Sequence, residues 1–160
     1  SLGHGLSIGV GMALAARMDN RSYHVYVVLG DGECDEGSVW EAAMAASHYK
    51  LDGLTAFVDR NRLQISGSTE EIMHQDNAEE RWAAFGWNVL SIPGNDIEAI
   101  LAAVELAKRT KGKPTAIIAN TTKGAGVSFI ENKAGWHHKV PSDAELAEAL
   151  KELDERRSRL

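Results

Sequence analysis

Four short, nearly continuous apolar runs recur along the chain, and a segment with helical periodicity separates each from the next. The runs are Val25–Leu29, Leu54–Val58, Trp87–Ile92 and Thr115–Ala119. Runs that lack polar alternation are typical of strands covered on both faces. Helices are expected at residues 4–17, 38–49, 77–85, 96–109 and 143–157. This alternation predicts an α/β fold, a doubly wound three-layer sandwich with a mainly parallel sheet and right-handed crossovers.

The overall composition fits one globular domain over residues 1–160, with 44% hydrophobic and 25% charged residues. The net charge of −6 argues against a nucleic-acid partner, which would favour a basic face. The apolar stretch from Leu6 to Ala16 is too short for a membrane span, which needs about 20 residues. Cys34 is the single cysteine, so no intrachain disulfide can form, and we expect a cytoplasmic protein.

The chain begins at Ser1 rather than at a methionine and shows no secretory signal. We therefore expect a trimmed chain or a piece of a longer protein.

Three expected helices begin with a pattern that resembles a capping box. Ser38 precedes Glu41, Asn95 precedes Glu98, and Ser142 precedes Glu145, each at a spacing of three. These patterns predict Ser38, Asn95 and Ser142 as the helix N-caps.

The first expected helix is rich in glycine, with Gly3, Gly5, Gly9 and Gly11 within nine residues. Glycine inside a helix costs roughly 1 kcal/mol relative to alanine, so another backbone is expected to pack close. The sequence leaves two interpretations open, a tight helix–sheet contact or a subunit interface near a cofactor.

A possible metal site follows two of the expected strands. Gly30-Asp31-Gly32 ends the first apolar run, and Asn61 follows the second. Because parallel strands end at one edge of the sheet, where open α/β folds bind ligands, Asp31 and Asn61 should meet there. Hard oxygen ligands suit Mg²⁺ or Ca²⁺, with positions left for water and phosphate. The pattern predicts a metal site that binds a diphosphate.

Less specific interpretations exist for both residues. Asp31 could cap a turn, and Asn61 could adopt a left-handed turn conformation. An EF-hand built on Asp31, Glu33 and Asp35 fails, because the sixth position is Glu36 where glycine is needed.

Longer motifs resemble a known family. The segment from Gly30 to Glu41, Gly-Asp-Gly-Glu-Cys-Asp-Glu-Gly-Ser-Val-Trp-Glu, and Asp59-Arg-Asn-Arg62 resemble the fingerprint of thiamine diphosphate enzymes, and more narrowly transketolase. The resemblance extends over nearly the whole chain. It includes Ser1-Leu-Gly-His-Gly5, Leu63-Gln-Ile-Ser-Gly67, Phe85-Gly-Trp87, Lys123-Gly-Ala-Gly126 and Trp136-His137.

The resemblance implies roles for individual residues. Asp31, Asn61 and the backbone carbonyl of Leu63 would bind the divalent metal, which holds both phosphates of thiamine diphosphate. Gly32 would allow a close backbone approach to the diphosphate, and Leu2 would pack near the cofactor ring. The implied cofactor-binding set is Leu2, Gly30, Asp31, Gly32, Glu36, Asn61 and His137.

Two further residues receive catalytic roles from the same resemblance. His137 would reach the diphosphate and the substrate channel. Glu36, together with Glu41, would belong to a network that links the two cofactor sites of a dimer. His138 departs from the family, which usually has glycine at this position.

The implied function is transketolase activity, in which a two-carbon ketol unit moves from a ketose phosphate to an aldose phosphate of the pentose phosphate pathway. The family's upstream segment and its pyrimidine-binding domain are not in this sequence. A C-terminal transketolase subunit or domain is therefore the expected partner, in a homodimer or a heterotetramer. Two alternatives stay open: another thiamine diphosphate enzyme, either deoxyxylulose phosphate synthase or a dehydrogenase E1 component, and a non-catalytic assembly subunit.

Overall fold

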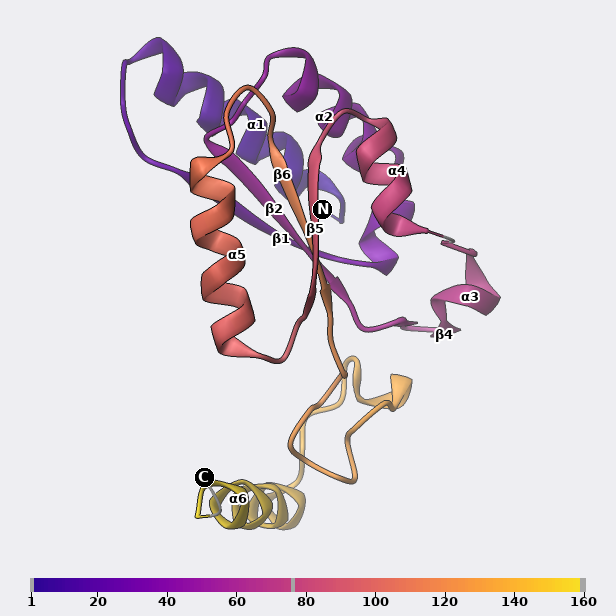
Figure 1. Cartoon of the computed structure of the whole chain (residues 1–160). Coiled ribbons are helices and arrows are strands. Elements are labelled where there is room, and N and C mark those ends of the chain that lie inside the picture. Colours follow the sequence, from indigo (N-terminus) through magenta and orange to yellow (C-terminus); the bar gives the residue numbers. More distant parts are fainter. Residues whose placement is uncertain (1, 76, 159–160) are drawn as a thin grey trace.

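The protein is built on a sheet of four parallel strands, shown in the computed structural model, which describes residues 2–75 and 77–158 (Figure 1). The strand order is β1-β2-β6-β5, so the chain passes from β2 out to β5 before it returns to β6. The strands are β1 Val25–Gly30, β2 Leu54–Arg60, β5 Asn88–Pro93 and β6 Thr115–Asn120. They coincide with the four apolar runs to within two residues at each end, which confirms the predicted parallel α/β fold.

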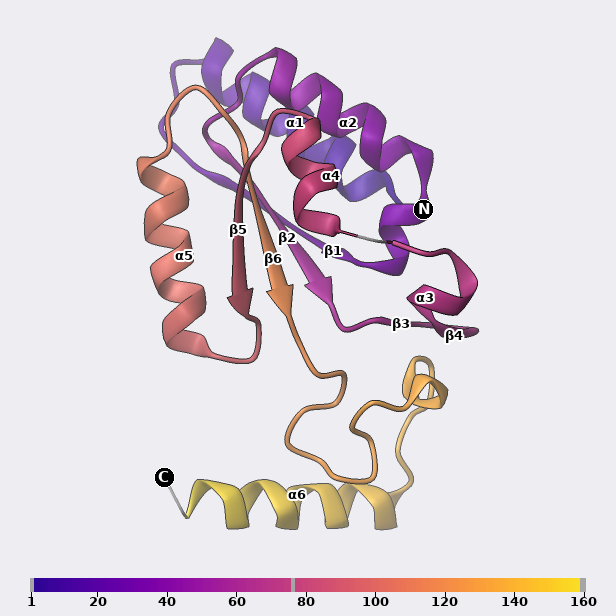
Figure 2. The same ribbon diagram turned by 45° about the vertical axis from the view of Figure 1, so that its right-hand side comes forward.

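Helices cover both faces of the sheet, but unequally (Figures 1 and 2). Helices α1, α2 and α4 lie on one face, where most of the buried apolar side chains gather. Of the helices in the described residues, α5 alone lies on the other face, where Ala103 and Ala107 pack against Ile117. The helices are α1 His4–Met18, α2 Gly37–His48, α4 Ala78–Ala84 and α5 Ile97–Arg109.

The expectation that every strand is covered on both faces is wrong for β1. Tyr26 and Val28 on this strand are 42% and 72% exposed. Helix α5 packs over β5 and β6 and does not reach the edge strand, whereas β6 is buried from Thr115 to Ala119.

The capping predictions are right for one helix of three. Ser142 caps α6 (Asp143–Arg157) with the full capping box. Helix α5 is capped by Asp96, one residue later than predicted, while Asn95 accepts a hydrogen bond from the Thr122 N–H. Helix α2 begins at Gly37, so Glu36 takes the N-cap position and makes no side-chain cap. Ser38 lies inside the helix and donates its hydroxyl to the Gly3 carbonyl.

The glycines of α1 include both close and open positions. A Cβ at Gly9 would lie 2.5 Å from Cγ2 of Val27, so α1 approaches β1 closely there. A Cβ at Gly11 would meet nothing within 4 Å. The tight helix–sheet contact therefore explains Gly9 and does not explain Gly11.

Several small elements beyond the carboxyl ends of the strands were not expected from the sequence. A short hairpin follows β2, and a single-turn helix follows the hairpin. These elements are η1 Gly32–Asp35, β3 Leu63–Gln64, β4 Gly67–Ser68, α3 Thr69–Ile72 and η2 Ala134–Trp136.

After β6, a long loop leads to α6, which stands apart from the sheet (Figure 2). Ser128 in the loop donates its N–H and its hydroxyl to Glu152 of α6 at 2.6 and 2.7 Å. No helix among the described residues is both long and apolar enough to cross a bilayer.

Candidate functional site

Asp31 lies directly after β1 and is almost completely buried, at 1% exposure. Its Oδ1 accepts the N–H of Gly32 at 2.8 Å, and its Oδ2 accepts the N–H of Arg62 at 2.6 Å. Burial raises the pKa of this carboxyl, and the two backbone hydrogen bonds partly offset that effect. The side chain is therefore held in one orientation by backbone groups from two different segments.

Asn61 lies beside Asp31 because β1 and β2 are neighbours. Gly30 pairs with Asp59 in the parallel register, and the Asp31 N–H donates to the Asp59 carbonyl at 3.2 Å. The Oδ1 atom of Asn61 accepts the N–H of Leu63 at 3.0 Å. Since the Asp31 carboxylate contacts the N–H of the next residue, Arg62, it lies against the Asn61–Arg62 peptide.

A left-handed turn does not account for Asn61. The residue with positive φ in this loop is Arg62, at φ 62°. This turn directs the Arg62 N–H toward Asp31, and the Asn61 side chain accepts the N–H of Leu63, two residues later.

These residues border one cavity of about 390 Å³ at the carboxyl edge of the sheet. Leu2 comes from the turn before α1, and His137 comes from the long loop after β6. The cavity is lined by Leu2, Gly30, Asp31, Gly32, Glu33, Asn61, Leu63, Gln64, Ile65, Ser66 and His137. Segments from four parts of the chain thus meet at the edge of the sheet that the sequence indicated.

Glu36 is the one predicted site residue that does not line this cavity. It occupies the N-cap position of α2 and is exposed, and Glu41 on the same helix is also exposed.

Four residues of the lining had no site role in the expectations from the sequence, although three of them lie in the family motif Leu63–Gly67: Glu33, Gln64, Ile65 and Ser66. Gln64 lies over Gly32, since a Cβ at Gly32 would meet its Oε1 at 2.6 Å. The signal that could have found three of them is the segment directly after Asn61, which turns back as the β3–β4 hairpin over the strand ends.

His137 adds an ionisable ring to the cavity. Partial burial, the charge of Lys123 and the neighbouring His138 lower the pKa of the His137 imidazole below its ordinary value of 6.5. The two histidine rings meet edge-to-face with their centroids 4.6 Å apart. A lowered pKa favours the neutral form of the His137 ring, which can accept a proton.

Within residues 2–75 and 77–158, no group of three His, Cys, Asp or Glu side chains could hold a metal ion. A metal at this edge would therefore also need amide or carbonyl oxygens. Asn61 and Leu63 line the same cavity as Asp31, and a side-chain amide oxygen and a backbone carbonyl are donors that suit Mg²⁺ and Ca²⁺. Each Asp31 oxygen keeps a free lone pair beyond its hydrogen bond, so the donor set fits a hard divalent cation.

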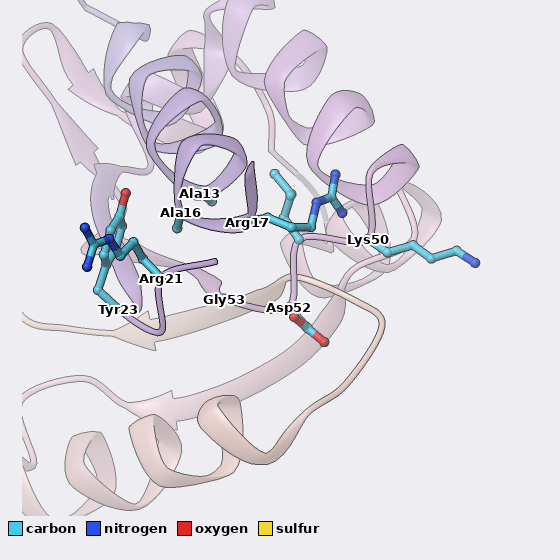
Figure 3. A pocket seen from close by; sticks show the side chains of 9 residues that line it. Ala13, Ala16, Arg17, Arg21, Tyr23, Lys50, Asp52 and Gly53 are labelled. Carbon is cyan, nitrogen blue, oxygen red and sulfur yellow. The ribbon is translucent and has the colours of Figure 1, made fainter. Parts of the chain in front are cut away.

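A second cavity, of about 180 Å³, lies at the opposite, amino edge of the sheet (Figure 3). Arg17, Arg21, Lys50 and Asp52 are among its lining residues. The Lys50 side chain points away from the others, and Arg17 and Arg21 lie on different sides of the cavity (Figure 3). Arg17 already donates to the Tyr49 carbonyl at 2.5 Å, so these cations do not converge on one position.

A family comparison matches this chain with the thiamine diphosphate binding domain of transketolase over residues 1–155. The chain belongs to this family. The predicted resemblance is therefore confirmed, and the cavity at the carboxyl edge lies within the matched region.

Individual relatives agree with the family match. The chain is 52% identical over 160 residues to an apulose-4-phosphate transketolase subunit of Phocaeicola vulgatus, covering 100% of this chain and 57% of the relative. It is 48% identical over 154 residues to a 6-deoxy-6-sulfo-D-fructose transketolase subunit of a Clostridium species, covering 96% and 56%. The chain thus spans little more than half the length of these relatives.

Among solved structures, a transketolase from Campylobacter jejuni aligns with a TM-score of 0.78 at 28% identity, covering 99% of this chain and 30% of that one. The four-stranded parallel fold is therefore that of transketolases.

Proposed function

We propose that this chain is the thiamine diphosphate-binding part of a transketolase, which moves a two-carbon ketol unit from a ketose phosphate to an aldose phosphate. The observation that carries the proposal is the placement of Asp31 and Asn61 at neighbouring strand ends, on one cavity with Leu63 and His137. The relatives named as transketolase subunits support the same reaction class.

The metal site consists of the Asp31 carboxylate, the Asn61 amide oxygen and the Leu63 carbonyl. These oxygens would hold Mg²⁺ or Ca²⁺, and the cation would neutralise charge on the diphosphate of the cofactor. The support is the chemistry of the donors and the fixed orientation of Asp31 between the N–H groups of Gly32 and Arg62.

The remaining lining residues orient the cofactor. Gly30 and Gly32 expose backbone to the diphosphate, and Leu2 packs near the organic ring. Gln64 covers Gly32, so its side chain has to move aside or contact the diphosphate directly. Bound thiamine diphosphate supplies the electron sink for carbon–carbon bond cleavage and formation.

His137 donates or accepts a proton beside the substrate. Its lowered pKa keeps the imidazole neutral near pH 7, so the ring can polarise a sugar oxygen or relay a proton.

A C-terminal transketolase subunit or domain completes the enzyme by adding the pyrimidine-binding part. The relatives whose names describe one subunit of a transketolase support a split enzyme. Residues 1–160 form the diphosphate-binding domain of a homodimer or heterotetramer that works in the cytoplasm, in the pentose phosphate pathway. Glu36 and Glu41 are exposed and outside the cavity, where they can meet a neighbouring subunit to form the network between cofactor sites.

The test is reconstitution with the C-terminal partner. The mixture should convert xylulose 5-phosphate and ribose 5-phosphate only when thiamine diphosphate and Mg²⁺ or Ca²⁺ are present, and neither subunit should be active by itself. Assembly of the two subunits without cofactor binding would instead identify a non-catalytic scaffold. Turnover of apulose-4-phosphate, with none of xylulose 5-phosphate, would keep the reaction class and change the donor sugar.

A further inference from the structure

The turn that carries Leu2 is held by two side chains from the segment that follows β1. We infer that Glu33 and Ser38 are positioning residues that fix the backbone of Gly3 and thereby set the place of Leu2 in the cofactor cavity. This inference rests on the proposed function, because it assigns these two side chains a purpose at the same site.

Glu33 joins two loops that are distant in sequence. Its Oε1 accepts the N–H of Gly3 at 3.0 Å, and its Oε2 accepts the N–H of Gly30 at 3.1 Å. One carboxylate therefore links the start of α1 to the end of β1, next to Asp31. Hydrogen bonds to a charged acceptor are shorter and stronger than those between neutral groups.

Ser38 bonds to the second polar atom of the Gly3 backbone, its carbonyl oxygen. Its hydroxyl donates to the Gly3 carbonyl at 3.1 Å. Both backbone polar atoms of Gly3 are thus bonded to side chains of the η1–α2 segment. The N-cap of α1 makes no side-chain hydrogen bond of its own, so this end of the helix is fixed from across the fold.

The packing around Gly3 leaves no room for a side chain at this position. Gly3 has φ 79°, and a Cβ there would lie 2.7 Å from Cβ of Glu36 and 2.8 Å from Oγ of Ser38. The turn that leads into α1 therefore needs glycine here, and the hydrogen bonds from Glu33 and Ser38 hold its backbone. Leu2 is the preceding residue, it lines the cavity, and it is 60% exposed.

Glu33 also lines the cavity, as a catalytic carboxylate would. Its two oxygens bond to backbone N–H groups of two different loops, the turn before α1 and the end of β1, and this link between loops is the reason that we assign it to positioning. A positioning role predicts a selective effect. Loss of a hydrogen bond from Glu33 or Ser38 to Gly3 should weaken contacts to the organic part of the cofactor more than contacts to its diphosphate.

The experiment measures two dissociation constants on the enzyme reconstituted with its partner subunit. One probe is thiamine diphosphate and the other is inorganic pyrophosphate, each with Mg²⁺, by titration calorimetry. The variants are Ser38→Ala, which removes only the bond to the Gly3 carbonyl, and Glu33→Gln, which keeps the size but loses one acceptor. Glu152→Gln is the matched control, because Glu152 also accepts two hydrogen bonds, from Ser128, far from the cavity.

For Ser38→Ala and Glu33→Gln, the ratio of the thiamine diphosphate constant to the pyrophosphate constant should rise about fivefold to tenfold, the effect of one lost hydrogen bond. Glu152→Gln should leave the ratio within about twofold of the wild-type value. The ratio cancels general losses of stability. Ser38→Ala keeps the charge of the cavity and therefore decides the test, because Glu33→Gln also removes a negative charge to which the two probes respond differently.

If the wild-type enzyme binds both probes and the ratio is unchanged in both variants, Glu33 and Ser38 do not position Leu2. Equally weaker binding of both probes also refutes the inference, since a merely structural role would give that result. A wild-type enzyme that binds pyrophosphate but not thiamine diphosphate refutes the proposed function instead, so the two failures are distinguishable.

Discussion

The two ends of the parallel sheet each carry a cavity, and they differ in how their charged side chains are held. At the carboxyl end, the Asp31 carboxylate is buried and fixed by the N–H groups of Gly32 and Arg62. At the amino end, Arg17 and Lys50 extend from the surface without converging (Figure 3). A preorganised site needs side chains that are held around one common position before the ligand arrives. Arg17 and Asp52 at the amino end each bond to a backbone group, but the cations there do not converge on one position.

The largest expected difference between the two ends comes from removing an aspartate at each. Asp31→Ala should abolish metal-dependent binding of thiamine diphosphate, a loss of about 100-fold or more, because the only carboxylate of the proposed metal site is gone. Titration calorimetry with Mg²⁺ on the reconstituted enzyme measures this loss.

Asp52→Ala is the control at the amino end, where Asp52 accepts the Gly112 N–H at the surface. It should leave the cofactor affinity within about twofold. Unchanged affinity in a folded Asp31→Ala variant would refute the metal site.

Helix α1 connects the two ends, and its glycines allow a matched comparison of stability. Gly9→Ala should destabilise the protein by about 1–3 kcal/mol, because the new methyl group would overlap Val27. Gly11→Ala should be neutral or stabilise the helix by up to about 1 kcal/mol, since its Cβ would face open space. Urea unfolding of both variants measures the difference.

Equal effects at the two positions would contradict the close approach of α1 to β1. If Gly11→Ala instead weakens assembly with the partner subunit, the exposed side of α1 lies at a subunit interface.

The pKa of His137 tests the electrostatic environment of the carboxyl end. We expect an NMR titration of the free chain to give a pKa below 6.5, because burial and Lys123 disfavour the charged imidazolium. Lys123→Gln removes a positive charge and should raise the pKa toward 6.5. Activity that depends on neutral His137 should fall as the pH drops through this pKa.

A pKa of His137 that stays in place after Lys123→Gln would show that the Lys123 charge has no effect on the ring. Lys50→Gln at the amino end is the matched control and should not move this pKa.

The smallest effect is expected from Arg17→Ala at the amino end. It removes the hydrogen bond to the Tyr49 carbonyl at the surface and should cost less than about 1 kcal/mol of stability. Cofactor affinity should not change. A clear loss of affinity would show that the amino end influences the cofactor site, against the contrast between the two ends.

The convergence of Asp31 and Asn61 could be predicted because it depends on local patterns. Each residue directly follows an apolar strand, and adjacent parallel strands end at the same edge. The cap at Ser142 was predictable for a similar reason, since both partners of the capping box lie within four residues.

The predictions that failed involve bonds between distant segments. Ser38 has the sequence of a helix cap, but its hydroxyl binds Gly3, 35 residues away. Asn95 likewise binds Thr122 rather than its own helix. Exposure of Tyr26 and Val28 could not be predicted either, because it depends on where α5 packs and not on the composition of β1.

The sequence by itself determined the order of the elements, the parallel sheet and the edge at which Asp31 and Asn61 emerge. Hydrophobic periodicity and strand ends are local properties, and a parallel sheet places its strand ends together. Only the tertiary structure decided that Glu33 and Gln64 share one cavity with them and that Glu36 lies outside it. His137, which only the family resemblance had indicated, lines the same cavity. These positions depend on contacts between segments up to about a hundred residues apart, and no local pattern encodes such contacts.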